Sequence, residues 1–104
     1  MSKKPTYEQL MGQIAEAAVG YQQAETKRNA LRRELNGLYK TYFAAYGHPH
    51  PGEPRKRINP EDDRFRGVLS FTDAAFRRWL DARELTTKLK RKLRGLVERL
   101  ERGQ

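Results

Sequence analysis

Hydrophobic residues recur at alternating spacings of three and four along the first part of the chain, with polar residues between them. The recurring positions are Tyr7, Leu10, Ile14, Ala17, Tyr21, Ala24, Leu31, Leu35, Leu38, Tyr42 and Ala45, and Arg28 fills the one missing position. Residues three and four apart share one face of an α-helix, and a repeat of about five heptads is typical of a coiled-coil seam. The pattern therefore predicts one long helix over residues 6–46.

Both ends of this predicted helix carry local signals. Thr6 and Gln9 have the spacing of a capping box, in which two side chains satisfy exposed backbone N–H groups. Gly47 fits the position just after the last helical residue, and Pro49 prevents the helix from continuing. Residues 1–5 are predicted to be a disordered basic tail. Three interior glycines could mark the close approach of another helix: Gly12, Gly20 and Gly37.

Residues 47–59 are rich in proline, glycine and basic side chains, which predicts a loop. Asn59 and Pro60 then precede three acidic residues, the order typical of an N-cap, a first-turn proline and an acidic first turn. This order predicts a short helix over residues 60–66 that stops at Gly67.

A second long helix is predicted over residues 70–102, and its C-terminal part is strongly basic. Its apolar positions include Phe76, Trp79, Leu80, Leu85, Leu89, Leu93, Leu96, Val97 and Leu100, while Ala75, Ala82 and Thr86 keep the same spacing. Two amphipathic helices joined by a loop predict an all-α fold. We expect an antiparallel, coiled-coil-like two-helix hairpin with a short third helix in the connection, forming one domain.

The aromatic residues suggest a register for this hairpin. Eight of them fall around the connection and should form one cluster there: Tyr39, Tyr42, Phe43, Tyr46, Phe65, Phe71, Phe76 and Trp79. If Tyr42 lies near Phe76, Ala17 and Tyr21 face Val97 and Leu100. Leu10, Met11 and Ile14 would then extend beyond the partner helix, which favours self-association, for example as a homodimer.

The charge balance points to an anionic partner. The formal net charge is +9 and the isoelectric point about 10.2, a balance that attracts nucleic acid, acidic proteins or anionic membranes. The absence of cysteine excludes disulfides and thiolate metal sites. No apolar run resembles a signal peptide or a membrane span, so a soluble, cytoplasmic protein is expected and a membrane partner is not.

Three groups of cations are candidate binding residues. The C-terminal basic patch comprises Lys88, Lys90, Arg91, Lys92 and Arg94, which surround Leu89 and Leu93 on the predicted helix. The first-helix cations are Lys27, Arg28, Arg32 and Arg33, and the predicted register brings them beside this patch in one belt. The loop cations are Arg55, Lys56 and Arg57. Any of these groups could instead be an ordinary solvated surface.

Other chemical signals are weak. His48 and His50 are interpreted as polar loop residues, because a structural metal site needs more ligands than the two histidines supply. The acidic run Glu61 to Asp63 is explained by a helix start. The connection is also a loose match to a helix-turn-helix, with Arg77 and Arg78 in its second helix. No arrangement for catalysis and no cofactor or small-molecule site is predicted.

The sequence thus favours a non-enzymatic nucleic-acid-binding protein that contacts phosphates with little sequence preference. DNA and RNA both fit. A small subunit of a nucleoprotein complex and a plasmid or phage accessory protein are both compatible with these features. The alternative is a coiled-coil adaptor or inhibitor that binds an acidic protein, in which case the charge would steer association.

Overall fold

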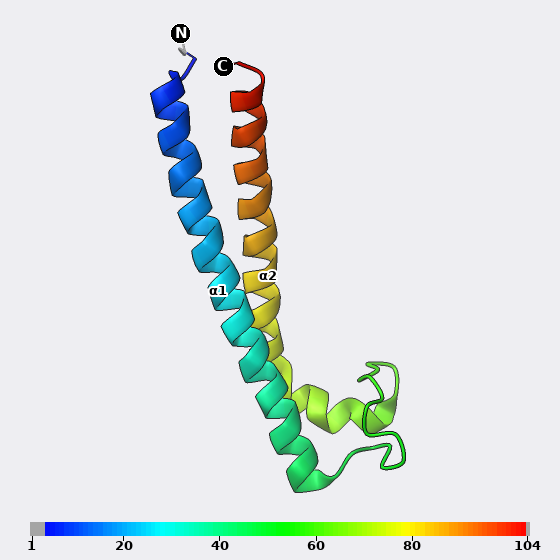
Figure 1. The fold of residues 1–104 in the computed structure, drawn as a ribbon. Coiled ribbons are helices and arrows are strands. Elements are labelled where there is room, and N and C mark those ends of the chain that lie inside the picture. The colour runs from blue at the N-terminus through cyan, green and yellow to red at the C-terminus, as the bar shows by residue number, and fades with distance from the viewer. Residues whose placement is uncertain (1–3, 104) are drawn as a thin grey trace. The chain divides into compact units, whose positions relative to one another are not determined.

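The protein is an all-α helical hairpin whose two long helices pack against each other, as predicted. The computed structural model describes residues 4–103, and its elements are α1 (Tyr7–Tyr46), the 3₁₀ helix η1 (Asp63–Phe65) and α2 (Arg66–Glu101). Figure 1 shows these elements in chain order. No strand occurs within residues 4–103. Residues 1–3 of the predicted basic tail lie outside the described residues, and Lys4 to Thr6 have no regular secondary structure.

The predicted signals at the ends of α1 are confirmed. The backbone N–H of Thr6 donates to Gln9 Oε1 (2.9 Å), and the backbone N–H of Gln9 donates to Thr6 Oγ1 (3.1 Å), which completes the capping box. At the other end the N–H of Gly47 donates to the carbonyl of Phe43 (2.8 Å). Gly47 has φ +81°, a left-handed conformation that glycine adopts without steric cost.

The connection differs from the predicted short helix over residues 60–66. Asn59 Oδ1 accepts from the N–H of Glu61 (3.0 Å) in a local turn, and the cap is instead Asp62, whose carboxylate accepts from the N–H of Arg64 (3.0 Å). The helical turn therefore starts later, at Asp63. It leads directly into α2, which passes through Gly67 without a break.

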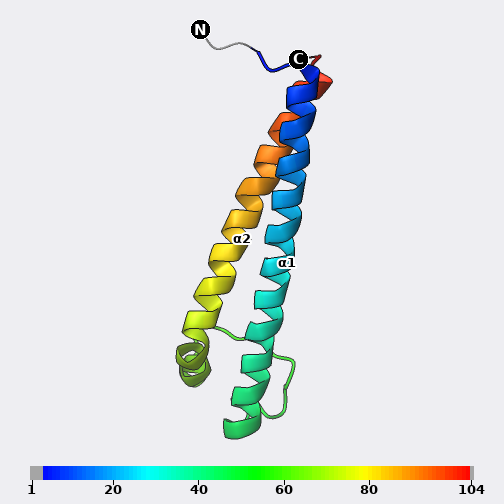
Figure 2. The same ribbon diagram turned by 90° about the vertical axis from the view of Figure 1, so that its left-hand side faces the viewer.

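The hairpin consists of two compact units. The first unit pairs residues 4–29 with residues 81–103, and its core contains Leu10, Ala17 and Leu96, with Leu100 packed against them. The first turns of α1 therefore lie beside the last turns of α2, as Figures 1 and 2 show. Leu10 is completely buried and Ile14 packs against the same core, so the predicted overhang of Leu10, Met11 and Ile14 is wrong, and with it the argument for self-association that rested on this overhang.

The second unit spans residues 30–80 and has a core of its own. Leu35, Phe65, Val68 and Thr72 are fully buried there. Phe76, predicted as apolar core, is 39% exposed, because the true seam of α2 runs through Thr72, Ala75 and Trp79. In the first unit Leu85 is likewise exposed, and Thr86 takes its place in the core.

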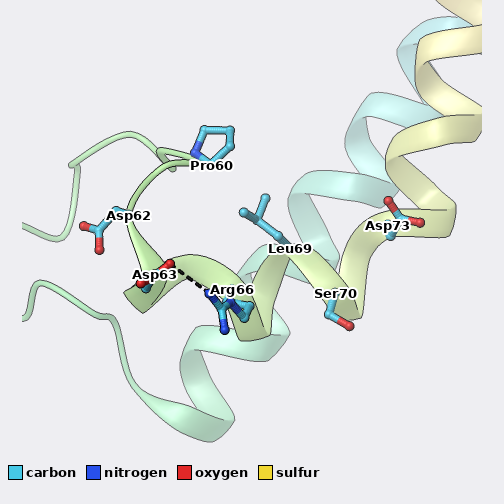
Figure 3. Close-up of a pocket in the computed structure, with 7 residues that line it drawn as sticks. All are labelled: Pro60, Asp62, Asp63, Arg66, Leu69, Ser70 and Asp73. Atoms are coloured by element: carbon cyan, nitrogen blue, oxygen red, sulfur yellow. Dashed lines mark hydrogen bonds and ion pairs between the residues drawn. The ribbon is translucent and has the colours of Figure 1, made fainter.

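The buried threonines satisfy their hydroxyl groups within α2. Thr72 Oγ1 donates to the carbonyl of Val68 (2.8 Å), and Thr86 Oγ1 donates to the carbonyl of Ala82 (2.7 Å). This bonding to the preceding turn lets a polar residue occupy an apolar seam, and it often bends a helix. Figure 3 shows α2 changing direction between Ser70 and Asp73, the segment that contains Thr72. The bend gives the start of α2 its own direction, toward the loop.

The helical glycines differ in the space around them. Apart from its chain neighbours and its own helix backbone, no described atom lies within 4 Å of the position that a Cβ on Gly37 would take. The same holds for Gly12 and Gly20, so their predicted role in close helix approach is wrong. A Cβ on Gly67 would overlap the Tyr42 hydroxyl. Gly67, predicted to stop a helix, is therefore the glycine at which a neighbouring side chain approaches α2 closely.

Alanine substitutions should separate these two roles. Gly37→Ala is expected to stabilise the protein by up to about 1 kcal/mol, because alanine is the better helix former. Gly67→Ala is expected to destabilise it, since Tyr42 must move. Urea unfolding followed by circular dichroism measures both changes. Tyr42→Phe, which removes the hydroxyl, should rescue part of the loss in Gly67→Ala. Equal stabilisation by both alanines would contradict the close contact at Gly67.

Candidate nucleic-acid interface

The C-terminal basic patch forms a dense positive surface on the first unit. All five of its cations are exposed, while Leu89 and Leu93 between them are partly buried in the seam. Within residues 4–103, none of the five makes an ion pair. The helix therefore presents five cationic side chains to solvent without a neutralising carboxylate among residues 4–103, and such a surface attracts polyanions.

Arg28 occupies the seam of α1 and is only partly available. Its side chain is 30% exposed, lies 3.8 Å from the Glu25 carboxylate and donates to Asn29 Oδ1. Tyr21 Oη donates to the same Glu25 carboxylate (2.9 Å). This hydrogen bond is the main cause that raises the pKa of Tyr21, and desolvation is the next. Tyr21 and Arg28 thus place a small polar network on the seam. Lys27, beside it in the chain, is exposed.

The predicted single belt of cations is not supported. Arg32 and Arg33 belong to the second unit, whereas Lys27, Arg28 and the C-terminal basic patch belong to the first. Arg32 is exposed, and its guanidinium lies over the Trp79 ring, 4.8 Å from the ring centre. The Glu34 carboxylate forms an ion pair with Arg78 (2.8 Å) rather than with Arg32 or Arg33.

A groove of about 860 Å³ lies in the second unit between α1, the loop and the start of α2. Two of the loop cations, Lys56 and Arg57, line it together with Arg32. Its aromatic lining consists of Tyr39, Phe43, His48 and Phe76. Arg55 is exposed and does not line the groove. The sequence predicted the cations individually but not the groove, because the loop has no periodicity that would place it against the helices.

The sequence suggested that His48 and His50 are polar loop residues, but both rings lie against aromatic side chains. The His48 ring lies 4.7 Å from Phe43 and, edge to face, 6.0 Å from Phe65. His50 lies 5.5 Å from Phe65, and its Nε2 is 3.0 Å from Asp62 Oδ2. The two histidines therefore anchor the loop to aromatic residues. The predicted aromatic cluster is present in part: the Tyr42 ring lies against those of Phe43, Tyr46 and Phe71, and the Phe76 ring lies 5.8 Å from that of Trp79.

A shallow hollow at the start of α2 gathers three carboxylates (Figure 3). Each of them has a cationic partner: Asp62 with Arg64, Asp63 with Arg66, and Asp73 with Arg77. The hydrogen bonds from Arg64, together with that from His50, hold the pKa of Asp62 well below its usual range. Asp62 and Asp63 therefore serve the helix start as its cap and its acidic first-turn residue, whereas Glu61 precedes the helical turn, unlike the prediction.

Asp62 should make the attachment of the loop dependent on pH. Because its pKa is lower in the folded state, its stabilising effect is present above the ordinary value of 3.8 and is lost as the pH falls below it. We expect Asp62→Asn to lower the thermal midpoint at neutral pH, with a difference from the natural protein that shrinks in acid. Glu61→Gln, which removes the adjacent exposed carboxylate, is the control. A pH-independent difference would contradict this role of Asp62.

The loose match to a helix-turn-helix is wrong, because η1 runs into α2 without an intervening turn. Arg77 and Arg78, its expected recognition residues, pair with Asp73 and Glu34. Neither long helix in the described part of the chain is apolar enough to cross a membrane. Comparisons with models of protein families, with curated proteins and with solved structures found no match. Any functional inference therefore rests on the residues themselves.

Proposed function

We propose that the protein binds nucleic acid without enzymatic activity, mainly through phosphate contacts and with little sequence preference. The observation that carries this proposal is the C-terminal basic patch, with five exposed cations and no ion pair to any described carboxylate. Lysine and arginine on a helix neutralise phosphates, and the counterions released from the nucleic acid drive binding. Contacts of this kind need density of charge rather than a base-reading motif.

The energetics of the patch favour an anionic partner. Like charges at neighbouring positions of a helix repel one another and cost a few tenths of a kcal/mol per pair. Replacing Lys or Arg with Gln at one patch position would remove part of this repulsion. A bound polyanion removes it too while preserving every cation. We therefore expect added polyanion to raise the thermal midpoint of the protein.

An acidic protein is the second partner that this charge could attract, as an adaptor or inhibitor would require. Two of the seam leucines, Leu10 and Leu35, are already fully buried within the chain. A protein partner would therefore meet the charged surface rather than these residues. Nucleic acid suits such a surface better, since its charges are regularly spaced. A cytoplasmic nucleoprotein subunit or a plasmid or phage accessory protein would have this role, as a monomer or a homodimer.

Fluorescence anisotropy tests the proposal. Labelled duplex DNA, single-stranded DNA and RNA are titrated with the protein at about 50 and about 200 mM salt, a range over which phosphate-dominated binding weakens by orders of magnitude. We expect binding at low salt that falls steeply as salt increases and varies little with base sequence. No binding at low salt would refute the proposal. An acidic polypeptide titrated in parallel shows whether any polyanion suffices.

A further inference from the structure

We propose that the groove of the second unit holds one unpaired nucleotide of a single strand, with its base against aromatic rings and its phosphate against cations. This inference rests on the proposed function and specifies the ligand as single-stranded. Its residues come from three separate segments of the second unit: the C-terminal half of α1, the loop and the first turns of α2. The groove, of about 860 Å³, falls within the usual size of ligand sites.

The charge of the lining favours a phosphate. Arg32, Lys56 and Arg57 supply three positive charges. Asp73 is the carboxylate among the described lining residues, and Arg77 already pairs with it at 3.0 Å. Lys56 lies 3.8 Å from Glu53, but both side chains are well exposed, so this ion pair is weak. The lining is therefore net positive without its ligand.

Arg32 is positioned for this task by Trp79. The central carbon of its guanidinium lies over the indole ring, 4.8 Å from the ring centre, which is a cation–π arrangement. This contact engages the π-electrons of the indole rather than a hydrogen-bond acceptor, so it leaves the guanidinium N–H donors available to phosphate oxygens. Within residues 4–103 Arg32 has no ion pair with a carboxylate. Arg32 is thus held in place while its donors are uncommitted to a carboxylate.

The aromatic lining favours a base over an aliphatic anion. Phe76 is 39% exposed although it belongs to a helix that buries its seam, and Tyr39 and Phe43 line the same groove from α1. Bases stack on such rings with little sequence preference, at about 1–3 kcal/mol per base. A base must leave its duplex to reach a ring. The groove therefore predicts a preference for single strands over duplexes.

The experiment uses the full chain and a single-stranded oligonucleotide carrying one 2-aminopurine, whose fluorescence falls when it stacks. Binding is followed by anisotropy of an end label in the same samples. We expect the natural protein to quench 2-aminopurine and to bind the single strand more tightly than the matched duplex. Phe76→Leu and Arg32→Gln should each weaken the quenching at least severalfold. Thermal unfolding confirms that each variant is folded.

Two neighbouring substitutions supply matched controls. Phe71→Leu removes an aromatic ring that is 52% exposed on the same helix but outside the groove. Arg33→Gln removes an equal charge next to Arg32 in the chain, also outside the groove. Both variants should quench 2-aminopurine as the natural protein does, because neither residue lines the groove.

The outcomes separate this inference from the proposed function. Salt-dependent anisotropy without quenching, or equal quenching by groove and control variants, would refute the groove while leaving phosphate binding intact. No anisotropy change at low salt would refute both. A free nucleotide carries the same base and phosphate as a nucleotide within a strand, so 2-aminopurine nucleoside monophosphate is titrated as well. Emission of Trp79, the single tryptophan, serves as a further reporter of its binding. Binding of the monophosphate as tightly as the strand would overturn the assignment to a strand.

Discussion

Leu35→Ala is expected to destabilise the protein by about 2 to 5 kcal/mol, the usual cost of removing a fully buried leucine side chain. Leu35 has no exposed surface and lies in the core of the second unit. A loss of this size is a large fraction of the stability of a small domain. Urea unfolding measured by circular dichroism should show the transition at a markedly lower urea concentration.

Leu85→Ala is the matched control for this prediction. Leu85 is also a leucine within a long helix, but it is 49% exposed. The same substitution there should change stability by no more than about 0.5 kcal/mol, because little buried surface is lost and alanine favours the helix. Similar losses at Leu35 and Leu85 would mean that the assignment of buried and exposed faces is incorrect.

The large expected effect at Leu35 follows from the composition of the core. Four of its buried residues are alanines: Ala17, Ala24, Ala75 and Ala82. Alanine contributes little apolar area, and hydrophobic stabilisation scales with the area removed from water. The few large buried side chains, Leu10, Leu35 and Phe65 among them, must therefore supply most of the stabilisation.

The features that could be predicted from sequence depend on local rules. The three-four spacing predicted both helices, and the capping box at Thr6 and the glycine at Gly47 marked the ends of the first, because their hydrogen bonds join residues close in the chain. Residue type was a poorer guide than spacing. Phe76 and Leu85 are hydrophobic but exposed, whereas Thr72 and Thr86 are polar but buried.

The features that could not be predicted depend on residues far apart in the sequence. Gly67 meets Tyr42 only because α2 folds back onto α1, and no local signal marks that contact. The register placed Leu10 in the core with Leu96, contrary to the alignment inferred from the aromatic residues. The groove likewise brings together Arg32 of α1 and Arg57 of the loop, which are far apart in the sequence. The candidate binding residues were thus identifiable as cations, and those of the C-terminal basic patch as one group, but the residues that line the groove could not be grouped from the sequence.

The second large effect is expected from replacing Lys90, Arg91 and Lys92 together with glutamine. All three are exposed, and glutamine is a good helix former, so the fold should be preserved. Each lost phosphate contact should lower the dependence of log K on log salt by about one, or about three in total. The affinity at about 50 mM salt should fall at least roughly tenfold, equally for different base sequences.

A second triple variant distinguishes local contacts from the overall charge. Replacing Arg33, Lys40 and Arg66 with glutamine removes three positive charges from the second unit, at exposed positions outside both the C-terminal basic patch and the groove. If the patch holds phosphates directly, this variant should keep most of the natural affinity and salt dependence, since only long-range attraction is reduced. Equal losses in both triple variants, measured by anisotropy under identical conditions, would show that net charge rather than the patch determines binding. The patch is the one run in the sequence with five cations in seven residues. If the Lys90, Arg91 and Lys92 variant nevertheless bound nucleic acid as tightly as the natural protein, the patch would not be part of the interface.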